Sequence, residues 1–477
     1  MNLLGRIKDQ LIRMQFRRAG RYLSSADPQA IEQAGQREAL RAFARAARSV
    51  PAYGRLLASR GVRPSDVRTI DDFHRLVPLL DKQSVFAAND LPSLCAGGHL
   101  GDAQLFWTSS GHSGTYSFGL DSPAQQERAA IAAEFLLDRV FGILDRKTLL
   151  VNCLPMGIKV PVRSLSLAET SVRTDAALAL IRSLAGQFDQ FILMAESLVL
   201  KKLIEDGPAA GVDWHKLTVH AVTGAEFVAE NYRSYLAGLL GIDFDRPQDG
   251  MIGLNMGMSE LTLSVFSESI ETIRIRRAAQ KDPALRRVLF GEHADVCPEL
   301  MQYFPKRTYV ESLGDEALCP QLVVSVLDPA AHLPLIRYRT GDQASTMSYR
   351  RLEAILNSFG RRDLLPAWRL PLGVIWGRNP AIPADGPLSP AHVKEALYAD
   401  FDLAGRVTGA FTIQAGPARP AVLVQLKEGQ SPAGLADRLG ESLARYTPAR
   451  VDVRVVGYRD FPAGMELNYE RKCRYVA

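Results

Sequence analysis

Short apolar runs and segments of helical periodicity alternate through residues 105 to 370. The apolar runs include residues 148–154, 217–222 and 322–327, and the helical segments include residues 126–137 and 195–204. This alternation is typical of strands and helices that pack as separate layers. A chain of 477 residues is also too long to fold around one core. We therefore expect an α/β protein with a large, layered body of several subdomains.

Two smaller parts flank this body. Residues 1–100 have a mostly helical pattern and are expected to pack on the body. A crossing rich in proline and glycine begins near residue 378, and beyond it the pattern predicts strands at 407–413, 421–426 and 451–456 and helices at 390–398 and 433–446. We therefore predict three parts: a helical region at 1–100, the body at 101–376, and a small, mobile α+β domain at 377–477.

Composition argues against several classes of protein. The net charge of +5 is small and the basic residues are scattered, so nucleic-acid binding is not indicated. The five cysteines are far apart and odd in number, which argues against a disulfide framework and favours a reducing compartment. No apolar stretch is long enough to span a bilayer, and the charged start lacks the apolar run of a secretory signal. We therefore expect a cytoplasmic protein.

The densest basic run lies near the N-terminus. Six basic residues between positions 6 and 21 alternate with aliphatic residues at helical spacing. Such a helix could lie on a membrane surface. A packed helix with a solvated basic face is favoured, because the aliphatic residues suit a core seam equally well.

A loop rich in hydroxyl groups and glycine follows the apolar residues 105–107. Its backbone N–H groups and hydroxyls could wrap a polyphosphate, although Thr115 stands where the common nucleoside-triphosphate loop has a lysine. A serine-hydrolase elbow is disfavoured, because no serine here has glycine two residues before and two after it. Taken alone, the loop is explained equally well as a surface turn. The candidate phosphate-binding residues are Ser109, Ser110, Gly111, Ser113, Gly114 and Thr115, with His112 between them.

Two further turns follow or end predicted strands. Gly224, Ala225 and Glu226 come after the apolar run 217–222, and small residues at a strand end leave room for a flat ring. Residues 255–260 supply a glycine, a hydroxyl and the carboxylate of Glu260, which could bind Mg²⁺. Taken alone, each of these turns is explained as an ordinary loop at a strand end.

Residues 336–342 read Ile-Arg-Tyr-Arg-Thr-Gly-Asp and place the carboxylate of Asp342 just beyond a basic, aromatic strand end. Together with the loop at 108–115, Gly-Ala-Glu, Gly-x-Ser-Glu and Gly377-Arg378, in this order, the segment resembles the adenylate-forming superfamily of acyl-CoA synthetases, peptide-synthetase adenylation domains and luciferases. The segments at 304–307, 334–342 and 388–393 look most like its phenylacetate-CoA ligase branch. The resemblance covers residues 80 to 477.

The resemblance implies a role for each matching residue. The loop at 109–115 would hold the β and γ phosphates of ATP, with Ser259 beside them, and Glu260 would bind Mg²⁺. Gly224, Ala225, Glu226, Met256 and Gly257 would border the adenine, and Asp342 would accept hydrogen bonds from both ribose hydroxyls. The candidate catalytic residues are Arg378, which would approach the ribose and phosphates, Lys472, which the terminal segment would deliver, and His112.

The chemistry that the resemblance implies is activation of a carboxylic acid. A carboxylate oxygen attacks the α-phosphorus of ATP and pyrophosphate departs, while Mg²⁺, a lysine and loop N–H groups offset the negative charge. In close relatives the acyl group then passes to coenzyme A. Two alternatives stay open: transfer to an amine or a carrier-protein thiol, and a catalytically silent nucleotide-binding scaffold. A homodimer is also left open.

The acid pocket is expected beside the Gly-Ala-Glu turn. Met251, Ile252, Leu254 and Met256 would line it, which favours an apolar acyl or aryl group over an amino acid, and the branch resemblance favours an aromatic acid.

Five residues depart from the pattern of the superfamily, among them His112, which replaces a hydroxyl residue of the phosphate loop. Thr115 and Tyr116 replace a Lys-Pro pair at the end of the phosphate loop, and Met256 stands where a tyrosine usually stacks on adenine. Pro380 occupies the usual pivot of the small domain, and proline fixes φ. We hypothesise that the swing of this domain is curtailed; the alternative is that the crossing hinges elsewhere.

Overall fold

The computed structural model describes residues 3–109, 115–155, 158–224, 226–246, 250–292, 294–314, 320–378, 386–416, 419–462, 473, 475 and 476, with side chains from residue 10 onward except those of 262 and 263. Its N-terminal helices are α1 (Leu3–Ser25), α2 (Pro28–Ser49), α3 (Pro51–Ser59), α4 (Ile70–Leu76) and α5 (Leu91–Leu94).

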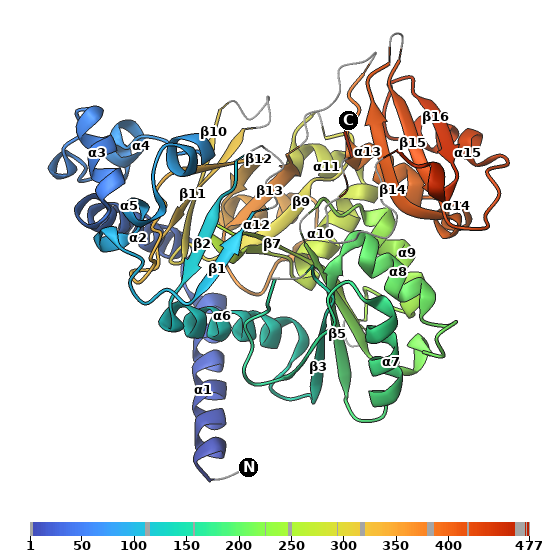
Figure 1. Cartoon of the computed structure of the whole chain (residues 1–477), viewed down its shortest axis with the longest axis horizontal. Helices are drawn as coiled ribbons and strands as arrows, with labels where there is room; N and C mark the ends of the chain where they lie inside the picture. The colour runs from blue at the N-terminus through green and yellow to red at the C-terminus, as the bar shows by residue number, and fades with distance from the viewer. Residues whose placement is uncertain are drawn as a thin grey trace.

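Helix α1 projects from the body (Figure 1). Phe16 anchors it through an edge-on contact with Phe135, with 5.2 Å between the ring centroids. Leu11 and Met14 remain 49% exposed. The helix therefore packs along one side and leaves the other side to solvent.

Among the described residues, eleven strands form one sheet in the order β10-β11-β12-β13-β9-β8-β7-β6-β5-β3-β4. Strand β7 pairs parallel with β6 and antiparallel with β8, so it separates a parallel half of the sheet from an antiparallel half. The carboxyl end of β7 is thus placed where open α/β sheets commonly bind ligands. The strands are β3 (Thr148–Asn152), β4 (Ser166–Glu169), β5 (Gln190–Glu196), β6 (Val219–Gly224), β7 (Ile252–Met258), β8 (Thr262–Ser267), β9 (Glu299–Tyr303), β10 (Thr308–Leu313), β11 (Gln321–Val326), β12 (Tyr338–Met347) and β13 (Leu372–Gly377).

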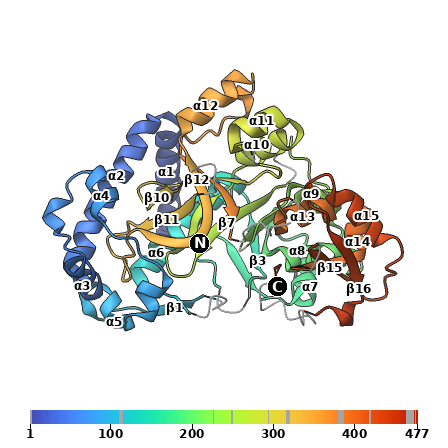
Figure 2. The same cartoon turned by 90° about the horizontal axis from the view of Figure 1, so that it is seen from above.

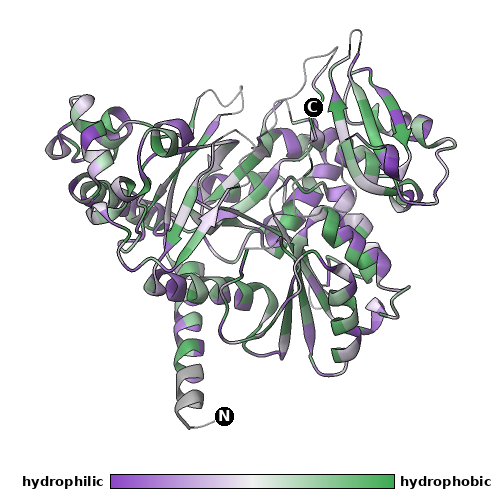
Figure 3. Cartoon of the chain, viewed as in Figure 1, coloured by the Kyte–Doolittle hydropathy of each residue, from purple (hydrophilic) through white to green (hydrophobic). Residues whose placement is uncertain are grey.

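Helices cover both halves of this sheet. The parallel half packs with α6 (Pro123–Phe141), α7 (Thr174–Leu184), α8 (Ser197–Asp206) and α9 (Glu230–Leu240), and the antiparallel half with α10 (Ile270–Lys281), α11 (Pro283–Phe290) and α12 (Tyr349–Ser358). Figure 3 shows the hydrophobic residues gathered in the central strands. A separate hairpin, β1 (Leu105–Thr108) and β2 (Phe118–Asp121), precedes α6. The predicted α/β class with a layered body is confirmed.

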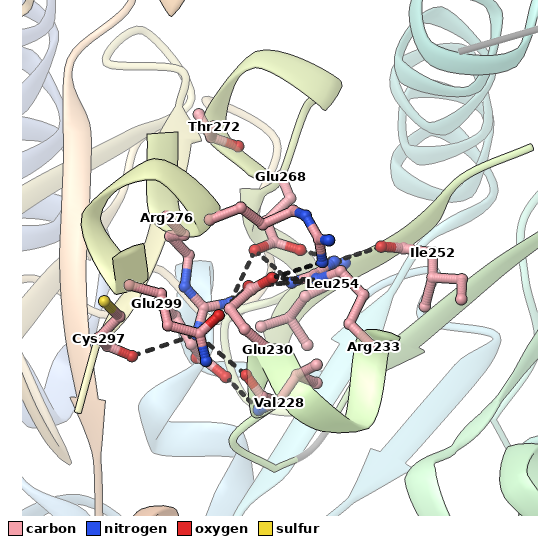
Figure 4. Close-up of polar contacts among 12 residues, drawn as sticks. Val228, Glu230, Arg233, Ile252, Leu254, Glu268, Thr272, Arg276, Cys297 and Glu299 are labelled. Carbon is pink, nitrogen blue, oxygen red and sulfur yellow. Dashed lines mark hydrogen bonds and ion pairs between the residues drawn. The ribbon is translucent and has the colours of Figure 1, made fainter. Parts of the chain in front are cut away.

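A buried cluster of charges joins α9, α10 and the start of β9 (Figure 4). Arg233 lies 2.9 Å from Glu268, and Arg276 lies 2.8 Å from Glu230, with all four side chains fully buried. Glu299 accepts a hydrogen bond of 2.9 Å from the backbone N–H of Val228. Since a buried charge is stable only beside its partner, the cluster fixes these helices against the strands.

The last elements form a smaller lobe around a three-stranded sheet in the order β14-β15-β16. Its elements are α13 (Pro390–Tyr398), α14 (Phe401–Arg406), β14 (Val407–Gln414), β15 (Ala421–Leu426), α15 (Leu435–Leu443) and β16 (Asp452–Val456). The lobe lies beside α8 and α9 (Figure 2). The Tyr398 ring packs on Tyr232 at 4.9 Å, and the ammonium of Lys201 donates to the carbonyl of Val407 at 2.8 Å. The lobe and the parallel half therefore share one hydrophobic core.

No helix in the described part of the chain has both the length and the apolar character needed to cross a membrane.

Candidate active site

The turn after β7 brings a carboxylate under the antiparallel half of the sheet. Glu260 is 8% exposed. One of its oxygens accepts a hydrogen bond of 3.0 Å from the hydroxyl of Tyr338, and the other accepts one of 3.0 Å from Ser259. Burial raises the pKa of Tyr338 and the charge of Glu260 raises it further, so the phenol remains a donor. Residues from β7 and β12, far apart in sequence, thus meet at one point.

The β1–β2 hairpin lies directly over this turn. A Cβ atom at position 119 would stand 2.9 Å from the carbonyl carbon of Ser259, closer than two carbon atoms approach, so only glycine fits at Gly119. Within the hairpin, the hydroxyl of Ser109 accepts a hydrogen bond of 3.0 Å from the N–H of Ser117. The start of the predicted phosphate loop is therefore tied to Ser117, two residues before the glycine that contacts Ser259.

Lys82 is a candidate that sequence reasoning missed. Its ammonium donates to the hydroxyl of Ser109 at 3.2 Å. Burial lowers the pKa of Lys82, the charge of Glu260 opposes that shift, and the charge of Arg378 reinforces it. The lysine therefore lies among the predicted phosphate and magnesium ligands. The predicted loop lacks its own lysine at Thr115, whose hydroxyl instead accepts a hydrogen bond of 3.0 Å from Gln83.

Strand β12 holds Lys82 in place. Leu80 forms a parallel bridge with Tyr338, and its N–H donates to the carbonyl of Arg337 at 2.9 Å. The buried side chain of Arg337 donates to the carbonyls of His74 at 2.8 Å and Val77 at 2.6 Å. Arg337 is thus structural, although it belongs to the segment that carries the resemblance, and it fastens residues 74–82 to the site.

Asp342 and Arg378 form a second pair at this site. The Arg378 side chain donates to the two carboxylate oxygens of Asp342 at 2.9 and 3.4 Å. Asp342 is 5% exposed, whereas the Arg378 side chain is 57% exposed. Attraction to Asp342 raises the pKa of Arg378, and Glu260 raises it further. The carboxylates of Asp342 and Glu260 therefore act on the same guanidinium and belong to one site.

The predicted adenine-bordering residues meet the C-terminal lobe. Glu226 pairs with Lys394 of α13 at 2.6 Å, and burial together with the charge of Glu226 raises the pKa of Tyr475. The N–H of Ile413 donates to the carbonyl of Tyr475 at 2.8 Å. The end of the chain therefore returns to the loop that follows β6.

The remaining predicted nucleotide residues on β6 and β7 lie nearby. A Cβ at Gly224 would stand 2.8 Å from the carbonyl oxygen of Asn255, so β6 and β7 approach closely there. Met256 is partly buried, and Gly257 is exposed.

Two adjoining cavities provide room for the acid. The smaller, about 160 Å³, is lined by Met251 and Leu254. Ile252 does not line it, and its side chain is fully buried in the core beside β7. The larger, about 730 Å³, extends from Ser259 and Glu260 beneath the hairpin toward α1.

Several predicted residues lie outside the described residues. They are Ser110, Gly111, His112, Ser113, Gly114, Ala225, Pro380 and Lys472.

The side chains present fit ATP and a magnesium ion. A single carboxylate with a neighbouring hydroxyl suits Mg²⁺, which commonly keeps several waters and shares its oxygen ligands with phosphates. In the described residues no group of three or more His, Cys, Asp or Glu side chains forms a protein-only metal cage. Asp342 retains acceptor capacity for ribose hydroxyls beside its contacts with Arg378.

Comparison by sequence finds no relative: no family profile and no curated protein matches. By structure, the chain is similar to 2-hydroxyisobutyryl-CoA ligase in the postadenylation state, in complex with R3-HIB-AMP (TM-score 0.70, 12% identity, 96% of this chain and 91% of that chain) or 2-HIB-AMP (0.68, 13%, 94% and 89%). The same ligase in the thioesterification state, with 2-HIB-AMP and CoA, has a TM-score of 0.57 at 12% identity over 96% and 91%. The chain therefore has the fold of this ligase, which confirms the fold that the motif resemblance predicted.

Proposed function

We propose that this protein is an AMP-forming acid ligase that converts a carboxylic acid to its acyl-adenylate and then transfers the acyl group to coenzyme A. One observation carries the proposal. The guanidinium of Arg378 donates to Asp342, and the charge of Glu260 raises the pKa of Arg378. The charges of Arg378 and Glu260 also shift the pKa of Lys82, which contacts the start of the phosphate loop. Five segments of the chain, around residues 82, 109, 260, 342 and 378, therefore converge on one polar site.

Each of these side chains has a task in the first half-reaction. The acid's carboxylate oxygen attacks the α-phosphorus, its bond to phosphorus forms as the bond to pyrophosphate breaks, and no proton is transferred. Lys82, at 3.2 Å from Ser109, would offset the charge of the phosphates. It would thus replace the loop lysine of the superfamily pattern, whose position Thr115 occupies in this chain. Asp342 would orient the ribose, and Lys472 would reach the reacting phosphate. Glu260 would hold a Mg²⁺ ion, which would supply further charge neutralisation.

The acid that we propose has an apolar, aromatic body. The cavity between β7 and α6 is lined by aliphatic side chains such as Leu136, Val140 and Leu254, which suit an aryl group. This assignment is in line with the phenylacetate-CoA ligase branch that the motifs resemble. The unpaired thiols of Cys95, Cys153 and Cys297 fit a reducing cytoplasm.

Coenzyme A is the acceptor that we favour, since the 2-hydroxyisobutyryl-CoA ligase with the same fold has been captured with its adenylate and CoA. We also propose that residues 377–477 act as a lid with a curtailed swing. Glu395 of α13 accepts hydrogen bonds from the N–H groups of Glu230 and Asn231 at 2.8 and 3.0 Å, and these contacts would have to break for the lobe to rotate.

Pyrophosphate release with a panel of carboxylic acids, measured with and without coenzyme A, tests the proposal. We expect release that depends on the acid and on Mg²⁺, with thioester formed when coenzyme A is present. Release without thioester would favour an amine or a carrier-protein thiol as the acceptor. No release under any condition would favour the silent scaffold and refute the proposal.

A further inference from the structure

Arg307 lies in the wall shared by the two cavities. It comes directly before β10, and it lines both the 730 Å³ cavity that reaches Glu260 and the 160 Å³ cavity beside β7. Lys159, on the loop before β4, also lines both. The junction of the two cavities is therefore positively charged, although the walls around it are largely apolar.

The guanidinium of Arg307 makes no hydrogen bond or ion pair with any residue that the structure describes, although an arginine has five N–H donors. Burial lowers the pKa of Arg307, and the charge of Asp328 opposes that shift. Asp328 itself accepts a hydrogen bond of 3.2 Å from Arg128, so its negative charge is shared between Arg128 and Arg307. A desolvated cation of this kind favours an anionic ligand.

The carboxylates in the cavity walls already have donors. Asp121 accepts from Trp107 at 2.8 Å, Glu169 from Asn152 at 2.7 Å, and Glu268 from Arg233 at 2.9 Å. Among the described residues at the junction, the carboxylates thus have partners whereas the guanidinium of Arg307 does not. An anion that enters would therefore meet no unpartnered carboxylate.

We propose that Arg307 binds a second anionic group of the acid, so that the substrate is a dicarboxylic acid with an apolar body. This inference rests on the proposed function and extends it to the substrate class. The reacting carboxylate would lie near Glu260, and the second carboxylate would lie at the cavity junction, where the planar guanidinium can bind it with two parallel hydrogen bonds.

The sheet register gives an order-of-magnitude backbone separation between the two ends of such a substrate. Val310 pairs with Val324, and Val324 pairs with Tyr338, whose hydroxyl contacts Glu260. Arg307 therefore lies three residues along and two strands across from Tyr338, on the order of 14 Å at ordinary strand spacings. A ring or several methylene groups fit between two carboxylates held at such a distance.

Isotope exchange between ATP and pyrophosphate tests the proposal with matched substrates. Each acid of a homologous series of α,ω-dicarboxylic acids, with aliphatic or aromatic bodies, is compared with its mono-amide. The proteins are the wild type, Arg307→Gln, Arg307→Lys and the control Arg287→Gln, which makes the same change at an exposed site on α11 outside both cavities. Calorimetric titration with the same acids in the absence of ATP measures binding independently of catalysis.

We expect one dicarboxylate to have a KM roughly 10- to 100-fold below that of its mono-amide in the wild type and in Arg287→Gln, as expected for a charge-assisted hydrogen bond. In Arg307→Gln this ratio should fall to about one while kcat changes little, and Arg307→Lys should retain part of it. Equal KM values in the wild type, or an unchanged ratio in Arg307→Gln, would overturn the proposal. If no acid supports exchange but calorimetry shows Arg307-dependent binding of a dicarboxylate, the proposed function fails and the anion site stands. If neither is seen, the site is refuted.

Discussion

Replacement of Gly119 by alanine should impair catalysis far more than stability. The new Cβ would stand 2.9 Å from the carbonyl carbon of Ser259 and 3.3 Å from the Trp107 ring. Since carbon atoms normally meet at about 3.5–4.0 Å, the hairpin would have to move on the order of 1 Å away from the Ser259–Glu260 turn. We expect overpacking to cost about 1–3 kcal/mol of unfolding free energy, and a displacement of this size to slow adenylation about 100-fold.

Exchange of pyrophosphate into ATP and thermal unfolding, measured in parallel, would separate these two effects. The matched control is Gly186→Ala, because a Cβ there meets no atom within 4 Å and the residue is exposed. We expect the control to match the wild type in both assays. An exchange rate and a KM for ATP in Gly119→Ala equal to those of the wild type would refute the argument that this close approach positions the phosphate loop.

Three further changes test the remaining parts of the site. Lys82→Met should lower the rate of adenylation by roughly 100-fold, because it removes a cation beside the phosphate loop; an unchanged exchange rate would exclude that role. Lys472→Ala should slow adenylation and leave ATP affinity, measured by calorimetry, nearly intact; full activity would show that the terminal segment is misassigned. Burial raises the pKa of Glu395 from 4.5 to about 7, so the folded state favours the protonated carboxyl. The stabilisation that this preference gives to the folded state is fully present below pH 4.5 and is lost as the pH rises through about 7. Glu395→Gln should therefore remove about 3 kcal/mol of pH dependence from the unfolding free energy measured by denaturant titration between these values; parallel curves for the two proteins would contradict this account.

Much of the secondary structure could be predicted from local patterns. The run at 421–426 forms β15, and the segment at 390–398 forms α13, with the predicted bounds. These predictions succeed because a buried strand needs a continuous apolar run and a helix needs an apolar stripe, and both patterns are visible in sequence. Pocket lining is less visible. Met251, Ile252 and Leu254 are equally apolar, yet Met251 and Leu254 line the cavity whereas Ile252 is buried away from it.

Some residues of the candidate site could be recognised from the sequence, and others only from the structure. Asp342 and Arg378 stand out because they occupy motif positions, and the structure places them 2.9 Å apart. Lys82 belongs to no motif, and its contact with Ser109 depends on the bridge between Leu80 and Tyr338. That bridge joins residues from distant parts of the chain, so no local spacing could have indicated the position of Lys82.

The sequence by itself determined the order of helices and strands and the type of chemistry, because both depend on the identity of residues close together in the chain. Only the tertiary structure decided which charges lack a partner. Arg307 belongs to a segment that carries the branch resemblance, yet its sequence does not indicate an unpaired charge; it becomes a candidate anion site because folding places it, partly buried, in the wall of two cavities without a described carboxylate to pair with it.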